Sequence, residues 1–371
     1  MKILGVETSC DDTAIAVLEG RDRILANVVS SQTALHRAYG GIVPELASRH
    51  HLENIQPILD EALGMAGARL TDIDGVAVTA GPGLIGSLLV GVSFAKALAW
   101  AMGRPLVGVN HLEGHVRAAY IEAPDLPYPA LALVVSGGHT SIYLSPEEGV
   151  YKLVARTRDD AAGEAFDKAA RLLGLGYPGG PIIDRLAKDG DPASVPFPRA
   201  RMSDGSLDFS FSGLKTAVLR QARAAGLAIE RSAPSPAYDP HGPERGPQED
   251  APAEPSQAVR DFAASFQTAV VDVLVERTMS AAQEQGARAV VVSGGVACNS
   301  LLRTAMRAAC DARGLALAIP APKYCTDNAA MIAAAGRLHL ERGERATLDL
   351  SAQPGWKLGG PEAARTTLRH K

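Results

Sequence analysis

The hydrophobic positions of this chain fall into short continuous apolar runs, separated by segments of helical periodicity. One pair of strand-like runs occupies Ile3 to Val6 and Ala14 to Leu18, and a second pair occupies Leu131 to Val135 and Ser141 to Leu144. Each pair flanks a polar turn of the form Ser-x-x-x-Thr. Alternating strand-like and helical segments follow both pairs, which favours a parallel or mixed sheet covered by helices. The repeated unit therefore predicts an α/β protein with two related lobes and a cleft between them.

The same patterns place the other elements along the chain. They predict helices at 44–65, 84–102, 161–173, 256–285, after Gly295 and at 327–340, and strands at 76–79, 106–109, 289–292 and 315–319. We expect a first lobe of residues 1–125 together with 327–345, whose helix returns to it, and a second lobe of residues 126–326. The chain beyond Glu341, with a tail at 346–371, is expected to pack loosely.

Residues 224–256 interrupt this pattern. Seven prolines lie between Pro234 and Pro255, and acidic residues outnumber basic ones in the segment, so we predict a flexible insertion without regular structure. Immediately before it, five basic residues outweigh two acidic ones: Arg199, Arg201, Lys215, Arg220 and Arg223 against Asp204 and Asp208. This strip could track phosphates, or it could be an ordinary solvated charged face.

Composition narrows the class of protein. The 371 residues are 46% hydrophobic but only 5% aromatic, which suits an α/β fold packed through small residues, and the net charge of −4 argues against a generally basic nucleic-acid binder. The one run of near-membrane length, Leu84 to Met102, contains Lys96, so it predicts a buried helix rather than a membrane span. The first residues do not resemble a secretory signal, and the four cysteines show no paired spacing, so we expect a cytoplasmic protein.

Two histidines form the clearest candidate metal site. His111 and His115 are four residues apart in a predicted helix and can share a metal ion, although they could also be an ordinary helical pair. Glu113 lies about 200° around the helix from His111, so it cannot take the place of the glutamate in a zinc-protease motif. Asp327 is a candidate third ligand or, alternatively, the N-cap of the last helix. Two histidines and one carboxylate would suit iron or zinc, and Cys325 could be proposed as a further ligand.

Three glycine-rich turns point to a nucleotide. They are Ser136-Gly137-Gly138, Pro178-Gly179-Gly180-Pro181 and Ser293-Gly294-Gly295. Backbone N–H groups at the start of a helix favour anions, and the missing side chains let a ligand approach. Asp167 and Asp184 could accept ribose hydroxyls. Each turn alone is common, but together they predict a nucleotide-binding cleft. The sequence contains no P-loop motif, so we expect the cleft to bind phosphate in another way.

The motifs resemble the TsaD family of tRNA N6-adenosine threonylcarbamoyltransferases, in order and in spacing. The resemblance covers about 1–220 and 257–340 and rests on L-G-V-E-T-S-C-D-D-T, the segment at 36–51, N-H-L-E-G-H, V-S-G-G-H-T, G-E-A-F-D-K, Y-P-G-G-P-I-I-D, S-G-G-V-A-C-N and C-T-D-N-A-A-M. It implies a two-lobed fold of the actin/Hsp70/sugar-kinase type. It also implies transfer of the threonylcarbamoyl group from threonylcarbamoyl-adenylate to N6 of the adenosine 3′ of the anticodon, in tRNAs reading codons that begin with A.

The resemblance also implies roles for individual residues. One divalent metal ion per chain, Fe or Zn, would be held by His111, His115 and Asp327. The adenylate would be bound by Val135, Ser136, Gly137, Gly138, His139, Asp167, Gly180, Asp184 and Asn299, while Ser9 and Asp11 would face the reacting group, with Asp11 as candidate base. Implied partners are tRNA, an adenylate synthase (TsaC-like), a dimerisation partner (TsaB-like) and an ATPase (TsaE-like). Asp12 stands where many relatives have Glu, and the insertion at 224–256 departs from typical members.

Three other functions remain as alternatives. A metalloprotease would use the histidine pair, but Glu113 is misplaced for it and no distal protease motif follows. A phosphotransferase of the same superfamily would use Asp11 as base and ATP as donor, although it needs no paired histidines. An ATP-dependent scaffold would need no metal ligands at all. We therefore expect the transferase.

Overall fold

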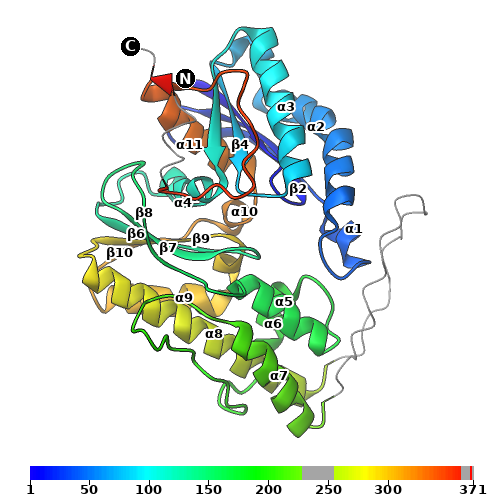
Figure 1. Cartoon of the computed structure of the whole chain (residues 1–371), viewed down its shortest axis with the longest axis vertical. Helices are drawn as coiled ribbons and strands as arrows, with labels where there is room; N and C mark the ends of the chain where they lie inside the picture. Colours follow the sequence, from blue (N-terminus) through cyan, green and yellow to red (C-terminus); the bar gives the residue numbers. More distant parts are fainter. Residues whose placement is uncertain (228–254, 361–367, 370–371) are drawn as a thin grey trace.

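Two five-stranded sheets form the frame of the computed structural model, which describes residues 1–227, 255–360 and 368–369 (Figure 1). The first sheet has the order β3-β2-β1-β4-β5 and the second the order β10-β9-β6-β7-β8. In each, an antiparallel hairpin lies on one side of the first strand and two parallel strands lie on the other. The strands are β1 Lys2–Glu7, β2 Asp12–Glu19, β3 Arg23–Ser31, β4 Gly75–Gly81, β5 Leu106–Asn110, β6 Ala130–Val135, β7 Thr140–Ser145, β8 Lys152–Arg156, β9 Ala289–Ser293 and β10 Ala316–Ala318.

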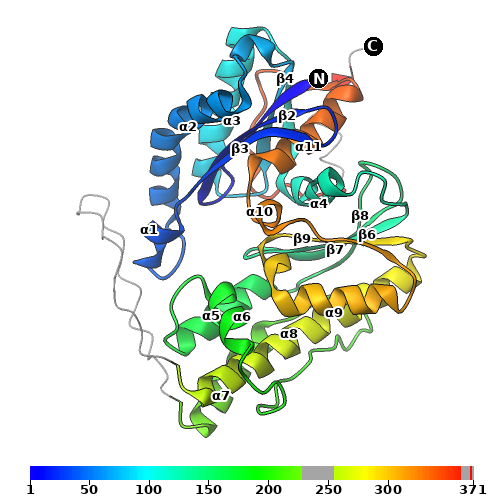
Figure 2. The same cartoon turned by 180° about the vertical axis from the view of Figure 1, so that it is seen from behind.

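When the second sheet is listed from its other edge, its order is β8-β7-β6-β9-β10, which is equivalent to that of the first sheet. This equivalence confirms the two related lobes predicted from the repeated strand–turn–strand unit. The two Ser-x-x-x-Thr turns connect β1 to β2 and β6 to β7, so they occupy equivalent positions in the two sheets. Figure 2 shows the two sheets as separate lobes, one above the other.

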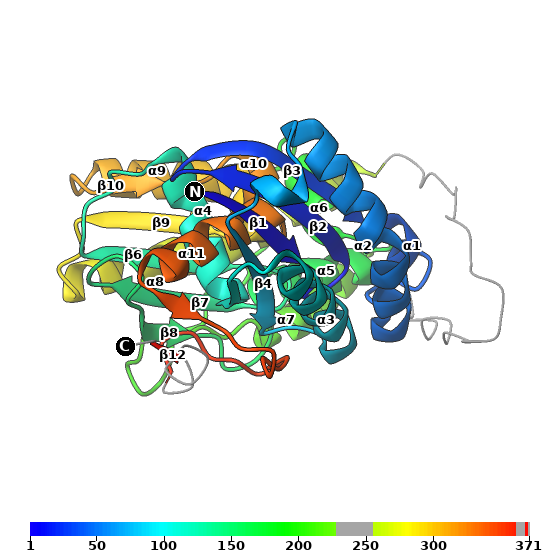
Figure 3. The same ribbon diagram turned by 90° about the horizontal axis from the view of Figure 1, so that it is seen from above.

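Helices cover the first sheet on both faces. α2 (Pro44–Ala66) and α3 (Ile85–Met102) pack on one face, and α11 (Ala329–Glu341) packs on the other (Figure 3). The approach of α11 is close because small residues meet there. A Cβ added at Gly5 of β1 would lie 2.3 Å from the carbonyl oxygen of Ala329. The low aromatic content thus serves tight helix-on-sheet packing.

The second lobe contains the largest apolar core. α8 (Gln257–Glu284) and α9 (Ser300–Asp311) pack with α5 (Ala162–Leu172), α6 (Gly179–Ala187) and α7 (Ser212–Ala224) against one side of its sheet. Phe166, Phe197, Phe262 and Phe266 meet edge to face in this core, with ring centroids 5.0–5.7 Å apart. Such contacts hold α5 and the loop at Phe197 against α8.

The helix α4 (His111–Glu122) lies between the two sheets and next to α11. Its Leu112 and Val116 join a cluster with Ala132 and Val291 of the second sheet, while Ala118 belongs to the cluster around α11. Buried on both sides, α4 and α11 form the layer that joins the lobes.

Several sequence expectations need correction. The last helix begins at Ala329, two residues later than predicted, and β3, β8, α6 and α7 were not predicted. The chain beyond Glu341 is not loosely packed up to residue 360, because Leu350, Trp356 and Leu358 are buried in the cores. The remaining short elements are α1 Thr33–Arg37, α10 Pro322–Cys325, β11 Glu344–Arg345, β12 Leu368–Arg369 and two 3₁₀ turns at 70–72 and 295–298. Most of the predicted insertion, 228–254, lies outside the described residues.

Two surface features bear on earlier alternatives. α3 is long and apolar enough to pass as a membrane span by length and composition, but one face of it packs on the first sheet. The prediction of a buried helix holds for that face only, since Ile85, Leu89 and Trp100 are exposed, Trp100 by 74%. In the basic strip, Arg199 pairs with Asp272 and Arg201 with Glu276, as expected of a solvated charged face.

Candidate metal centre and substrate cleft

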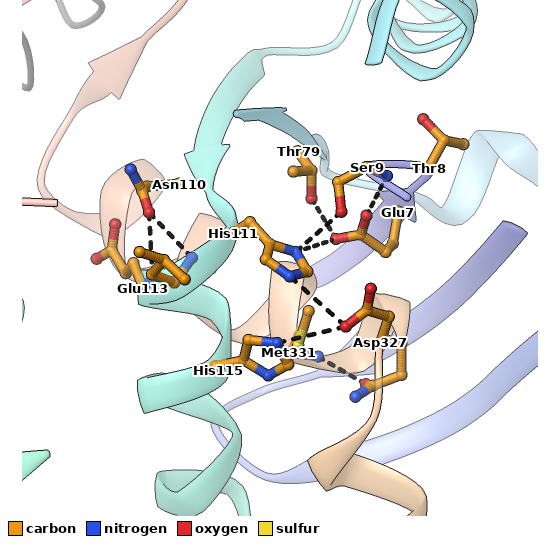
Figure 4. A network of polar contacts seen from close by, with 12 residues as sticks. Glu7, Thr8, Ser9, Thr79, Asn110, His111, Glu113, His115, Asp327 and Met331 are labelled. Carbon is orange, nitrogen blue, oxygen red and sulfur yellow. Dashed lines mark hydrogen bonds and ion pairs between the residues drawn. The ribbon is translucent and has the colours of Figure 1, made fainter. Parts of the chain in front are cut away.

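The histidine pair is positioned by the junction between β5 and α4. Asn110 ends β5, and its side-chain oxygen accepts hydrogen bonds from the backbone N–H groups of Leu112 and Glu113, which fixes the first turn of the helix. His111 is therefore the first residue of α4 and His115 lies one turn further on the same face, with the two ring centroids 4.6 Å apart. Both rings point toward Asp327 (Figure 4).

Asp327 is brought to this pair by the start of α11. The N-cap of α11 is Asn328, whose side chain accepts from the N–H of Met331, so the interpretation of Asp327 as the cap is wrong. Asp327 is free to point toward the histidines. Its Oδ1 lies 3.5 Å from His111 Nε2 and 3.3 Å from His115 Nε2. Ligand atoms of all three residues lie within 4.8 Å of one another.

The donor chemistry of this cluster fits a metal ion. His115 is completely buried, and its ring nitrogens make no well-aligned hydrogen bond with any described residue. Only Asp327 Oδ1 faces its Nε2, at 3.3 Å, and a bound cation would relieve this costly arrangement. Burial opposes a charged His111, but the carboxylates of Asp327 and Glu7 outweigh it and raise the pKa of His111 to about 9. Burial likewise opposes a charged Asp327, and the neighbouring histidines hold its pKa well below the usual range. Two imidazoles and a carboxylate form a set typical of Fe or Zn sites.

Two nearby residues serve other contacts. Glu113 points away from the cluster and pairs with His339 of α11, 2.9 Å from Glu113 Oε2 to His339 Nε2, so it cannot act as a protease base at the metal. The thiol of Cys325 is directed to the carbonyl oxygen of Pro320, at 3.2 Å, rather than to the histidines. Neither residue belongs to the cluster of potential ligands.

A cleft of about 610 Å³ opens beside this cluster, and both lobes line it. The lining includes nine of the residues expected at the site: Ser9, Asp11, His111, Ser136, Gly137, Gly138, His139, Asp167 and Asp327. Gly137 and Gly138 are exposed, and an added Cβ at either would meet no atom within 4 Å. The glycine turn of the second lobe thus offers its backbone to a ligand in the cleft.

Five expected residues stand outside the lining of this cleft: the completely buried His115 and four residues of the second lobe. Val135 is fully buried at the end of β6, and Gly180 lies in the first turn of α6, which is a helix start rather than a turn. Asp184 accepts hydrogen bonds from the N–H and hydroxyl of Ser300. Asn299 caps α9 and donates to Gln267, 2.8 Å away. The first contact ties α6 to the start of α9, and the second ties the start of α9 to α8.

Ionisable groups in the cleft have shifted pKa values. Burial, followed by the negative charge of Asp327, raises the pKa of Asp11 to about 6 and that of Asp12 to about 7. Burial, followed by His111 and His115, lowers the pKa of His139 to about 4. Near neutral pH the cleft therefore holds a carboxylate of raised basicity and an uncharged imidazole.

Sequence reasoning assigned no role to the segment after β3, which also lines the cleft. Thr33, Gly40, Gly41 and Ile42 contribute to the lining. The segment bridges the lobes through two hydrogen bonds in opposite directions: Arg37 Nε donates to the carbonyl of Tyr177, at 3.2 Å, and Arg171 donates to the carbonyl of Gly40. The segment at 36–51 was part of the family resemblance, so the sequence did mark this region, but it indicated no role for it.

Known proteins resemble this chain in sequence and in fold. The family model described as TsaD, tRNA N6-adenosine threonylcarbamoyltransferase, matches residues 23–334. Proteins of that name from Symbiobacterium thermophilum and Moorella thermoacetica are 54% and 48% identical to it, covering 96% and 95% of this chain and 97% and 96% of their own. Among solved structures, full-length HypF in its phosphate- and nucleotide-bound form has a TM-score of 0.55 at 12% identity, covering 90% of this chain and 45% of HypF.

Fold and site together define a two-lobed α/β protein of the actin/Hsp70/sugar-kinase type, with a histidine–carboxylate cluster between its lobes. The sequence similarity places it more narrowly. The chain belongs to the TsaD family of tRNA N6-adenosine threonylcarbamoyltransferases, which are acyltransferases of tRNA modification.

Proposed function

We propose that this protein transfers the threonylcarbamoyl group from threonylcarbamoyl-adenylate to N6 of the adenosine 3′ of the anticodon, in tRNAs reading codons that begin with A. The observation that carries the proposal is the placement of His111, His115 and Asp327 beside a cleft lined by an exposed glycine turn of the other lobe. This arrangement offers positive charge and backbone donors to one ligand, as an acyl adenylate requires.

The three ligand residues would hold one Fe or Zn ion per chain. When bound, such an ion supplies a Lewis acid that can hold the threonyl group and polarise the carbamoyl carbonyl. His111 and His115 offer imidazole nitrogens from one helix face, and Asp327 offers a carboxylate from the turn between α10 and α11. Asp327 also compensates the charge of the ion in a buried site.

The residues of the cleft would place and activate the two reactants. The N–H groups of Gly137 and Gly138 would stabilise negative charge on the departing phosphate. Asp11, with its pKa near 6, would accept the proton of the attacking amine, while Ser9 faces the same space. Exocyclic adenine nitrogen is a poor nucleophile, so orientation supplies much of the rate.

The remaining expected residues would fix the adenosine end of the donor. We assign this role to Val135, Ser136, His139 and Asp167, with Gly180, Asp184 and Asn299 further along the second lobe. Asp167 already accepts a hydrogen bond from the N–H of Gly179, 2.7 Å away, which ties the glycine start of α6 to the cleft. Asp184 and Asn299 meet at the start of α9 through Ser300.

Protein partners would complete the reaction in the cytoplasm. We assign to this chain a TsaC-like synthase as the source of adenylate, a TsaB-like dimerisation partner and a TsaE-like ATPase, besides tRNA. The exposed apolar residues Ile85, Leu89 and Trp100 form one stripe along α3, and Leu52 and Met65 are exposed on the adjacent α2. Exposed apolar side chains of this kind are typical of a surface that binds a protein partner, and we assign it to a helical partner. The four free cysteines fit a reducing compartment.

A transfer assay tests the proposal. Preformed threonylcarbamoyl-adenylate, unmodified tRNA and the partner proteins should yield modified adenosine and AMP in equal amounts, without ATP consumption in the transfer step. Asp327→Ala should reduce transfer by orders of magnitude, and the double variant His111→Ala/His115→Ala should lose the metal found in the wild type. A phosphotransferase would form ADP, and a protease would cleave peptides without tRNA. Absence of transfer with metal and partners present would refute the assignment.

A further inference from the structure

A charged side chain that is not a metal ligand lies at the back of the metal centre. Glu7 ends β1 and is completely buried. Its Oε1 accepts from the backbone N–H of Ser9, and its Oε2 accepts from Thr79 Oγ1, at 2.6 Å, and faces His111 Nδ1, at 3.0 Å. A buried carboxylate is costly, and an apolar residue would serve a strand end better. The Glu7 carboxylate is surrounded by three polar groups, one of which belongs to a candidate metal ligand, and this arrangement points to a role at the metal centre.

The geometry orients one imidazole ring. His111 has Nδ1 toward Glu7 and Nε2 toward Asp327, as Figure 4 shows. An ionised carboxylate can only accept a hydrogen bond, so its contact requires the proton of His111 on Nδ1. The lone pair of a neutral ring is then on Nε2, on the side of His115 and Asp327. Ser9 Oγ also lies 3.2 Å from Nδ1, but a hydroxyl can donate or accept and does not specify the tautomer.

The two histidines are not equivalent in this respect. His115 is completely buried, but its Nδ1 has no hydrogen-bond partner among the described residues, and its Nε2 faces only Asp327, 3.3 Å away. Glu7 also connects the centre to the first sheet, since Thr79 lies on β4, beside β1. His111 is therefore held by the first sheet through Glu7, whereas His115 is held mainly by its own helix, α4.

We propose that Glu7 is a positioning residue that holds His111 in the Nδ1–H tautomer, with Nε2 directed at the metal. This rests on the metal site of the proposed function but not on the identity of the transferred group. Carboxylate partners of this kind raise the basicity of a ligand and fix its ring, and their removal typically costs about 10–100-fold in metal affinity.

The decisive experiment measures metal affinity rather than transfer. Wild type, Glu7→Gln, Ser9→Ala and Thr79→Val are compared by chelator competition with Zn²⁺ at one pH, and by the visible spectrum of the Co²⁺-substituted protein. Glu7→Gln should bind Zn²⁺ about 10–100-fold more weakly and change the Co²⁺ spectrum. Thr79→Val keeps the contact between Glu7 and His111, so its loss should be smaller. Unchanged affinity in Glu7→Gln with a loss in Ser9→Ala would assign the tautomer to Ser9 and overturn the proposal.

A second measurement uses the wild-type protein, in case Glu7→Gln does not fold. ¹⁵N-histidine NMR of the Zn²⁺-loaded full chain should show His111 protonated at Nδ1 and metal-bound at Nε2. Metal at Nδ1 of His111 would refute the role of Glu7. Both readouts are independent of tRNA, so failure of the transfer assay with these results intact would count against the proposed function alone.

Discussion

The contact between α11 and the first sheet gives a prediction that can be worked from distances. A Cβ added at Gly336, in the middle of α11, would lie 2.2 Å from the Cβ of Ala77 on β4 and 3.2 Å from Val107 Cγ2. Carbon atoms approach to about 3.5 Å at closest ordinary contact, so Gly336→Ala is short of room by roughly 1.3 Å. Because the obstacle is a sheet core on one side and α4 on the other, the helix has little space to retreat.

The expected cost follows from two opposing effects. Overpacking a core costs about 1–3 kcal/mol, while Ala gains up to about 1 kcal/mol over Gly inside a helix. We expect Gly336→Ala to lose about 1–2 kcal/mol of unfolding free energy. α11 begins two residues after Asp327, so a displaced helix also moves this ligand. Metal affinity should fall by about tenfold or more, as it does when the support of a ligand is disturbed.

The matched control is the same substitution in open space. Gly64 lies in α2, and an added Cβ there meets nothing within 4 Å, so Gly64→Ala should stabilise the protein by about 0.5–1 kcal/mol. Urea unfolding followed by circular dichroism gives both stabilities, and chelator competition gives the metal affinity. If Gly336→Ala were as stable as Gly64→Ala and bound metal like the wild type, α11 could not lie against β4 as described.

Three further predictions concern the cleft, the partner surface and the insertion. Transfer should fall as pH drops through about 6, because Asp11 must be deprotonated to accept a proton, and the pH–rate profile of Asp11→Asn should lack this limb at a much lower rate. Trp100→Glu should weaken association with the dimerisation partner by more than tenfold in titration calorimetry, with unchanged folding, because the ring is 74% exposed in the free chain; unchanged affinity would move the partner surface elsewhere. Replacing residues 232–254 by a short Gly/Ser linker should leave solubility and transfer largely intact, since six prolines in that stretch oppose core structure; loss of either would reveal a structural or binding role.

The sequence predicted the elements whose signals are local. The apolar runs of β1 and β6 and the periodicity of α2 and α8 located those elements within one or two residues, and the spacing of His111 and His115 indicated one helix face correctly. Asp327 was harder, because Asp and Asn at adjacent positions both suit an N-cap, and only the path of the chain from α10 decides which one turns inward. Glu7 could not have been predicted, since its partners Thr79 and His111 come from strands and helices more than seventy residues away.

The buried tail shows the same limitation in another form. Residues 346–352 alternate apolar and polar side chains, but the alternation ends at Gln353 and does not indicate which core the segment joins. Their attachment depends on backbone groups: the N–H of Gln353 donates to the carbonyl of Ala80, and Asn110 donates to the carbonyl of Trp356. Hydrogen bonds to main-chain groups leave no pattern in the side-chain sequence.

The duplicated sheets produce a site that is not symmetric. At equivalent positions the β1–β2 turn carries Cys10, Asp11 and Asp12, whereas the β6–β7 turn carries Gly137, Gly138 and His139. The first turn thus carries acids, which can take up protons, and the second carries bare peptide groups, which can bind anions. A reaction that expels an anion and releases a proton needs an anion-binding group and a proton acceptor, and the two turns supply them from opposite sides of the cleft.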